Sequence, residues 1–212
     1  MEPVKDLTNV IDKLSELTLK NKEKKTPGGK NTNLNGKKFE DYTDCQKIIT
    51  EYDKIILGKG KFSFYRIKKE SSKSVIFVLQ SGLKSYFLKN YNITLFRYPD
   101  EAFLLVNEKA MTLYIIEKKE QAVEGSVETK LWAAPTLKRE YEIILDELKK
   151  KNLFEEINVN YIFCLSNFFK DKFNEENSKY QILQKIFIEN NIKVLFGEDE
   201  NYFSELQKIV NF

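Results

Sequence analysis

Histidine is absent from this chain of 212 residues, and cysteine occurs only twice, at Cys45 and Cys164. Without histidine the chain cannot form a Ser-His-Asp or Cys-His catalytic triad, a histidine-centred nuclease site or the usual zinc site of a hydrolase. Two cysteines cannot close a structural zinc site or a disulfide framework, and both lie in apolar-leaning segments, so we expect two buried thiols. Acid–base and metal chemistry must therefore use carboxylates, lysine, tyrosine and water.

Long apolar runs are also missing. No stretch of the sequence approaches the roughly 20 apolar residues that a membrane-spanning helix needs. Residues 1–6 lack the apolar segment of a signal peptide. The composition predicts an intracellular protein without membrane contact.

The net charge is small and unevenly distributed. Lys and Arg number 35 against 32 Asp and Glu, which gives +3. Residues 1–38 contain nine lysines and five acids, a local charge of +4, so the remainder carries about −1. Because the body of the chain is not strongly basic, we expect any contact with nucleic acid to come from a local basic face and the tail.

The apolar pattern divides the chain into a tail and one domain. Residues 3–20 have helical spacing and are followed by a lysine- and glycine-containing run, which predicts an N-terminal helix and a Lys-rich tether over residues 1–36. Residues 37–212 are enough for one α/β domain with a central mixed β-sheet flanked by helices. We expect helices over residues 38–56, 82–90, 136–150, 177–189 and 202–210, and strands over residues 62–67, 75–79, 93–96, 159–165 and 192–196, in addition to a central hairpin.

The central hairpin is the most informative stretch. Apolar runs precede and follow a polar turn at Glu108 and Lys109. For a two-residue turn at these positions, the numbers of directly opposed residues sum to about 217, so Asp100 lies opposite Glu117. Side chains alternate along a strand, and Glu117 and Lys119 therefore share one face.

Two opposed carboxylates at this position require a nearby cation. Opposed side chains have Cβ atoms roughly 4.5–5.5 Å apart, and carboxylates at this distance repel each other unless a cation lies between them. Cleavage of a phosphodiester bond by a metal needs carboxylates that hold the ion, a group that orients or deprotonates water, and positive charge for the phosphate. The pattern predicts that Asp100 and Glu117 hold a divalent metal. Lys119, its pKa lowered by the metal and partial burial, would orient the water or stabilise the transition state.

These residues resemble the PD-(D/E)XK nuclease superfamily, and within it the type II restriction endonuclease-like proteins of bacteria and large DNA viruses. The resemblance covers about residues 36–165 of the chain and implies a location in the cytoplasm or in a nucleoid or viral DNA compartment. It is carried by four segments, residues 36–40, 99–102, 115–121 and 125–131.

The resemblance implies roles for five residues. Asp100 and Glu117 bind Mg²⁺, for which Mn²⁺ can substitute, and Lys119 assists the attack of water. Glu40, on the first helix of the domain, supports the metal site, and Gln121 contacts the site or the phosphate. The implied products carry 5′-phosphate and 3′-hydroxyl ends, and cleavage of double-stranded DNA implies a homodimer.

A second Glu-x-Lys pattern occurs at Glu128 and Lys130. It follows a Gly-Ser turn without a long apolar run, so Glu117 is the favoured ligand, and Lys130 is expected to contact phosphate or bases from a loop. Lys138 and Arg139, on the helix that follows, are further candidates for DNA contact. Exposure to solvent explains these two residues equally well.

Aromatic residues make up 13% of the chain. Such side chains either pack in the core or stack on nucleic-acid bases, and core packing is the favoured use here. The aromatic residues for which both uses are open are Tyr86, Phe87, Tyr91, Phe96 and Trp132.

Together these observations predict a single PD-(D/E)XK-type domain with an N-terminal helical tail. The predicted activity is that of a Mg²⁺-dependent DNA endonuclease of the restriction type. One alternative keeps the fold and assigns it to DNA repair, recombination or replication processing, with branched, nicked or single-stranded substrates. The other alternative is a non-catalytic DNA-binding scaffold.

Overall fold

A computed structural model describes residues 30–57, 62–68, 73–121, 127–176 and 178–211. The chain separates into two compact units, Met1–Asn35 and Gly36–Phe212. The predicted helix over residues 3–20, and the tether up to residue 29, lie outside the described residues. The second unit contains the whole β-sheet and is described below.

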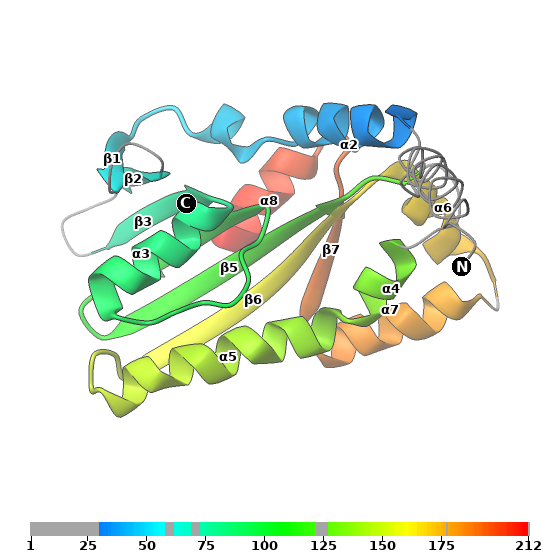
Figure 1. The fold of residues 1–212 in the computed structure, drawn as a ribbon. Helices are drawn as coiled ribbons and strands as arrows, with labels where there is room; N and C mark the ends of the chain where they lie inside the picture. Colours follow the sequence, from blue (N-terminus) through cyan, green and yellow to red (C-terminus); the bar gives the residue numbers. More distant parts are fainter. Residues whose placement is uncertain (1–29, 58–61, 69–72, 122–126, 177, 212) are drawn as a thin grey trace, which may run out of the picture. The chain divides into compact units, whose positions relative to one another are not determined.

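Seven strands form one mixed sheet: β1 (Asp53–Leu57), β2 (Phe62–Lys68), β3 (Ser74–Leu79), β4 (Glu101–Val106), β5 (Ala110–Lys119), β6 (Glu156–Leu165) and β7 (Ile192–Phe196). The strands lie side by side in chain order (Figure 1). Neighbours from β1 to β5 are antiparallel, whereas β5, β6 and β7 are parallel. The two parallel connections contain helices, because adjacent parallel strands need a long crossover.

Helices pack on both faces of the sheet and bury two apolar clusters. The larger cluster lies under α3 (Ser81–Tyr91), α4 (Val127–Trp132), α5 (Ala134–Lys150), α6 (Asn167–Asn174) and α7 (Lys179–Glu189). The smaller cluster involves α2 (Lys30–Tyr42), the 3₁₀-helix η2 (Cys45–Ile48) and α8 (Tyr202–Val210). Within the described ranges, no helix combines the length and apolarity needed to cross a membrane.

This architecture confirms the predicted α/β class with a mixed sheet flanked by helices. The helices expected over residues 82–90, 136–150 and 202–210 correspond to α3, α5 and α8. Cys45 and Cys164 are both buried and free, as their apolar surroundings predicted.

The predicted helix over residues 38–56 is wrong beyond Tyr42. There the Thr43 hydroxyl donates a hydrogen bond of 2.7 Å to the carbonyl four residues earlier, which ends α2. The Asp44 carboxylate then accepts a 2.8 Å hydrogen bond from a backbone N–H of η2 and caps that short helix. Residues 53–57 form β1, which is consistent with the strand preference of the β-branched pair at 55–56.

The predicted strand over residues 93–96 is also wrong. Ile93 and Leu95 are buried while Thr94 and Phe96 are exposed, so the two-residue alternation is real. The segment nevertheless belongs to the connection between α3 and β4 and pairs with none of the described strands. Alternation here reflects a loop that packs along the domain, which a sequence pattern cannot distinguish from a strand.

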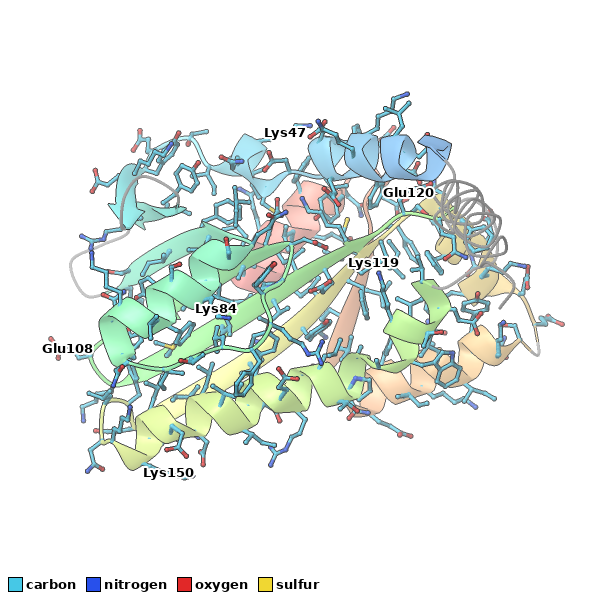
Figure 2. All side chains as sticks on the ribbon, in the orientation of Figure 1. Lys47, Lys84, Glu108, Lys119, Glu120 and Lys150 are labelled. Atoms are coloured by element: carbon cyan, nitrogen blue, oxygen red, sulfur yellow. The ribbon has the colours of Figure 1, made fainter. Side chains whose placement is uncertain are left out.

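The β4–β5 hairpin has the predicted register. Glu101 lies opposite Ile116, so the numbers of opposed residues sum to 217. Figure 2 shows Glu108 at the turn, at the opposite end of the hairpin from the candidate site. One step beyond the Glu101 pair, this register places Asp100 opposite Glu117.

Strand β6 is longer than its neighbour β7. It pairs with β5 along residues 156–165, but β7 pairs with residues 161–165 alone. Among the described strands, residues 156–160 therefore have a partner on one side only, and we call this segment the half-edge of β6. A hollow of about 770 Å³ adjoins this half-edge and is lined by Asn158, Asn160 and basic residues of α5.

Gly197, directly after β7, is a point of close approach between α2 and the sheet. A Cβ atom at this position would lie 2.5 Å from Thr43 Cγ2 and 2.8 Å from both Cys164 Sγ and the Phe39 ring. Real Cβ atoms do not approach other atoms this closely, so any larger residue forces the neighbours apart. By contrast, Gly36 on α2 has no atom within 4 Å of its virtual Cβ.

We therefore expect Gly197→Ala to lower the free energy of unfolding by about 1–3 kcal/mol, because it overpacks the core. Gly36→Ala is the matched control and is expected to raise that free energy by about 0.5–1 kcal/mol, because alanine favours a helix interior. Urea unfolding followed by circular dichroism measures both changes. A Gly197→Ala variant as stable as the parent would contradict the close approach.

Candidate active site

Three predicted residues meet at the open end of the β4–β5 hairpin. The Lys119 ammonium lies 3.1 Å from Asp100 Oδ2, 2.7 Å from Glu117 Oε2 and 2.8 Å from the carbonyl oxygen of Lys118. The Lys118 backbone N–H donates a 2.7 Å hydrogen bond to Asp100 Oδ2 and fixes that carboxylate against β5. Three oxygen atoms thus converge on a single cation.

Strand geometry explains this convergence. Glu117 and Lys119 are two residues apart on β5 and therefore project from the same face, toward α4 and α5. Figure 2 shows Lys119 at the end of β5 on the side of α4. The Asp100 carbonyl accepts a 3.2 Å hydrogen bond from the backbone N–H of Gln80, the residue directly after β3, so Asp100 is anchored on that side as well. Backbone pairing on both sides holds the carboxylates more rigidly than a loop could.

The pKa values of the site follow from burial and from charge pairing. Burial raises the pKa of Glu117, Lys119 opposes this change, and the charge of Asp100 adds to it. For Lys119, burial acts to lower the pKa, but the combined attraction of Glu117 and Asp100 outweighs it, and the pKa is raised. Burial therefore acts in the expected direction but is outweighed by the two carboxylates, and the lowering of the Lys119 pKa by a bound metal stays a prediction. Its ammonium keeps its proton because it lies between two carboxylates.

The site opens into a pocket of about 570 Å³, within the range of roughly 300–1,000 Å³ that is usual for ligand pockets. Glu117 and Lys119 line it together with side chains from α4, α5 and the connection before β4. Sequence reasoning did not single out Arg97 and Tyr98, which line the pocket and immediately precede Pro99 and Asp100. The signal that could have found them is a charged and an aromatic side chain next to a candidate ligand. The remaining pocket residues include Lys130, Leu137, Tyr141 and Tyr161.

A second pair of charges lies on the opposite face of the same strand ends. Lys118 Nζ is 2.6 Å from Glu101 Oε1, and the two side chains are only 3% and 4% exposed. The backbone N–H of Cys45 donates a 3.2 Å hydrogen bond to the same carboxylate oxygen. Lys118 Nζ also lies 3.5 Å from the carbonyl oxygen of Glu40. The pair therefore connects β4 and β5 to η2 and α2.

Sequence reasoning missed this buried ion pair. The available signal was that Glu101 and Lys118 share a face with Phe103 and Ile116, which belong to the smaller apolar cluster. Burial raises the pKa of Glu101, and Lys118 and Cys45 oppose that change. Removal of either charge would leave the other buried without compensation.

A double-mutant cycle on this pair tests its role. Glu101→Leu and Lys118→Met are each expected to lower the free energy of unfolding by about 3–5 kcal/mol, whereas the double variant loses much less. Strictly additive losses, measured by urea unfolding at pH 7, would contradict this coupling.

In Lys118→Met the Glu101 pKa stays raised, so this variant should be most stable at low pH and lose stability as pH rises above the ordinary glutamate pKa of about 4.3.

The structure does not bring Glu40 to the candidate site. Its side chain is exposed on α2, which packs with the smaller cluster, whereas Asp100 and Glu117 project from the other face of the sheet. Among the described residues, no group of three or more His, Cys, Asp or Glu side chains could hold a metal ion. The metal-supporting role expected for Glu40 is therefore not supported by its position.

Gln121 lies two residues beyond Lys119 and is buried. Its backbone N–H donates to Ser166 Oγ at 3.2 Å, and the Ser166 hydroxyl donates to its carbonyl at 3.1 Å. In the part of the chain that the structure describes, the side-chain amide has no hydrogen-bond partner. Its contact with a substrate stays a prediction.

The three basic residues expected to contact DNA differ in position. Lys130 is exposed and lines the site pocket. Lys138 is buried, and its ammonium donates a 2.7 Å hydrogen bond to the carbonyl of Asn190, the C-cap of α7. Arg139 is exposed and forms a 3.0 Å ion pair with Glu142. Lys138 therefore stabilises a helix end, and Lys130 is the residue best placed to meet a ligand.

The second Glu-x-Lys pattern lies on helix α4, and the loop expected there is wrong. Glu128 accepts hydrogen bonds from Lys179 at 2.7 Å and from Trp132 Nε1 at 3.4 Å. The Lys179 hydrogen bond lowers the pKa of Glu128. Glu128 thus connects α4 to α7.

No known protein family, curated protein or solved structure matches this chain. The resemblance to the PD-(D/E)XK superfamily therefore rests on the quoted residues. Function has to be argued from the chemistry of the site itself.

Proposed function

We propose that the protein is a Mg²⁺-dependent DNA nuclease that hydrolyses phosphodiester bonds. The observation that carries this proposal is the convergence of Asp100 Oδ2, Glu117 Oε2 and the Lys118 carbonyl oxygen on the Lys119 ammonium. Mg²⁺ prefers oxygen ligands and is usually bound through one or two carboxylates, with water and substrate phosphate as its other ligands. Two carboxylates and a carbonyl therefore fit Mg²⁺ or Mn²⁺ without a third acid.

In this proposal Asp100, Glu117 and the Lys118 carbonyl hold the ion, which when bound supplies Lewis-acid catalysis. Lys119 lies beside these ligands, where its ammonium would orient water or stabilise the charge that develops on the phosphate oxygens. Lys130 and Arg97 add positive charge at the pocket for the DNA backbone. The products would be 5′-phosphate and 3′-hydroxyl ends.

The restriction-type role and the homodimer extend this proposal. The strands of a duplex have opposite polarity, so a homodimer with two copies of the site would cut both strands in one binding event. Discrete fragments from a long duplex would favour the restriction role. Cleavage confined to branched, nicked or single-stranded DNA would favour repair, recombination or replication processing.

The activity test is direct. Purified protein with MgCl₂ or MnCl₂ should cut DNA, and Asp100→Asn, Glu117→Gln and Lys119→Met should each lose about 10²–10⁴-fold in rate. Glu128→Gln is the matched control, because it removes the same charge from the second Glu-x-Lys pattern and should retain activity. Plasmid, forked and single-stranded DNA are incubated with each variant, and products are resolved on gels. Undiminished cleavage by Lys119→Met would contradict the catalytic role assigned to Lys119.

Metal binding offers a test that is independent of turnover. Since the Lys119 ammonium contacts all three candidate ligands, a divalent ion must compete with it for these oxygens. Lys119→Met is therefore expected to bind Ca²⁺, a non-catalytic probe, about tenfold or more tightly than the parent in calorimetry. Lys130→Met removes a cation from the same pocket that touches none of the three oxygens, and should change the affinity much less. Equal Ca²⁺ affinity in parent and Lys119→Met would show that lysine and metal do not share these ligands.

A further inference from the structure

Two exposed aromatic rings lie two and four residues before Asp100 in the chain. Phe96 is 73% exposed and Tyr98 is 53% exposed, and Arg97 lies between them in the chain. Tyr86 and Phe87, by contrast, are buried in the larger apolar cluster. Burial of a large apolar side chain stabilises a fold, so packing does not explain why two rings next to the site face solvent.

The two rings line two neighbouring hollows. Tyr98 lines the site pocket described above. Phe96 lines a second hollow of about 530 Å³, whose other walls include Ile143 and Ile144 of α5. Arg97 lines the first hollow, Glu140 lines the second, and these two side chains form a 3.0 Å ion pair. The ion pair therefore lies where the two hollows adjoin.

Cationic side chains outnumber anionic ones in the lining of the two hollows. Two anionic side chains line them, Glu117 and Glu140. Glu117 is already paired with Lys119 and Glu140 with Arg97. Four cationic side chains line the same hollows, namely Arg97, Lys119, Lys130 and Arg139. Arg139 is paired with Glu142, and Lys119 also contacts Asp100. Among the described residues, Lys130 is therefore the lining cation most available to an anionic ligand.

We infer that these two hollows form a platform for an unpaired DNA strand next to the cut, a conclusion that rests on the proposed nuclease function. Bases of an unpaired strand can stack on aromatic side chains, whereas bases inside a duplex are covered by their neighbours. Glu117, Lys119 and Tyr98 line the same hollow, so a strand whose phosphate lies at the site meets one aromatic ring there, and Phe96 offers a second ring in the adjoining hollow. The platform favours forked, gapped or single-stranded substrates over uninterrupted duplex.

The test uses the full chain carrying Asp100→Asn, so that binding is measured without cleavage. A fluorescent forked duplex with unpaired arms and a blunt duplex of equal length are compared by anisotropy without metal. The forked DNA should bind more tightly than the blunt DNA. Adding Phe96→Ala or Tyr98→Ala should weaken binding of the fork by about 5- to 150-fold and leave the blunt duplex unaffected.

Two further variants separate stacking from other effects. Tyr98→Phe keeps an aromatic ring and should bind the fork like its Asp100→Asn parent. Tyr42→Ala is the matched control, because Tyr42 is 54% exposed on α2 and lines neither hollow. It should leave binding of the fork unchanged. Equal binding of fork and blunt duplex, or equal losses for Tyr42→Ala and Tyr98→Ala, would overturn the platform.

The outcomes distinguish this inference from the proposed function. Metal-dependent cutting of DNA, with no effect of Phe96→Ala or Tyr98→Ala on binding, would overturn the platform alone. Tight, ring-dependent binding of the fork by a parent protein that never cuts DNA would overturn the nuclease and retain the platform.

Two other ligands are tested in the same experiments. A forked RNA of the same sequence that binds more tightly than the DNA would overturn the assignment to DNA. The apolar second hollow could instead bind a second copy of the chain. In that case sedimentation would show a dimer that Phe96→Ala dissociates, while binding of the fork stays unchanged, and this result would overturn the platform.

Discussion

The candidate site depends on one constraint, the pairing register of β4 and β5. A slip of one residue would move Asp100 away from Glu117 and reverse the face from which one strand's side chains project. The two-residue turn that helps to fix this register lies about eight residues from Glu117, or roughly 27 Å along the strand. The chemistry at one end of the hairpin is therefore determined in part by the turn at the other end, where no functional group is needed.

The same register produces two ion clusters with different properties. On one face, Asp100, Glu117 and Lys119 adjoin a pocket, so water and solutes can compete for their contacts. On the other face, Glu101 and Lys118 are almost completely buried, and neither charge can exchange its partner for water. Solvent access, more than the identity of the charges, makes one cluster available for chemistry and the other a structural connection.

Local patterns predicted the hairpin, its register and the Asp100–Glu117–Lys119 group, because alternation and turn chemistry are local. They failed where distant contacts decide. Helix α2 ends because Thr43 and Asp44 bond the nearby backbone, although the apolar spacing continues. Glu40 lies on α2, over the face of the sheet opposite to Asp100 and Glu117. Lys138 is buried because its side chain reaches the end of α7, some fifty residues later in the chain. Neither α4 nor α6 was predicted, because each is only about two turns in length.

The half-edge of β6 has a consequence for how copies of this protein behave at high concentration. Residues 156–160 present backbone groups on one side without a neighbouring described strand, and such an edge can recruit a strand from another molecule and begin aggregation. The hollow beside it carries Lys149 and Lys150 together with Asn158 and Asn160. Charged and amide side chains at an open edge oppose strand addition, so solubility depends here on residues that contribute little to the core.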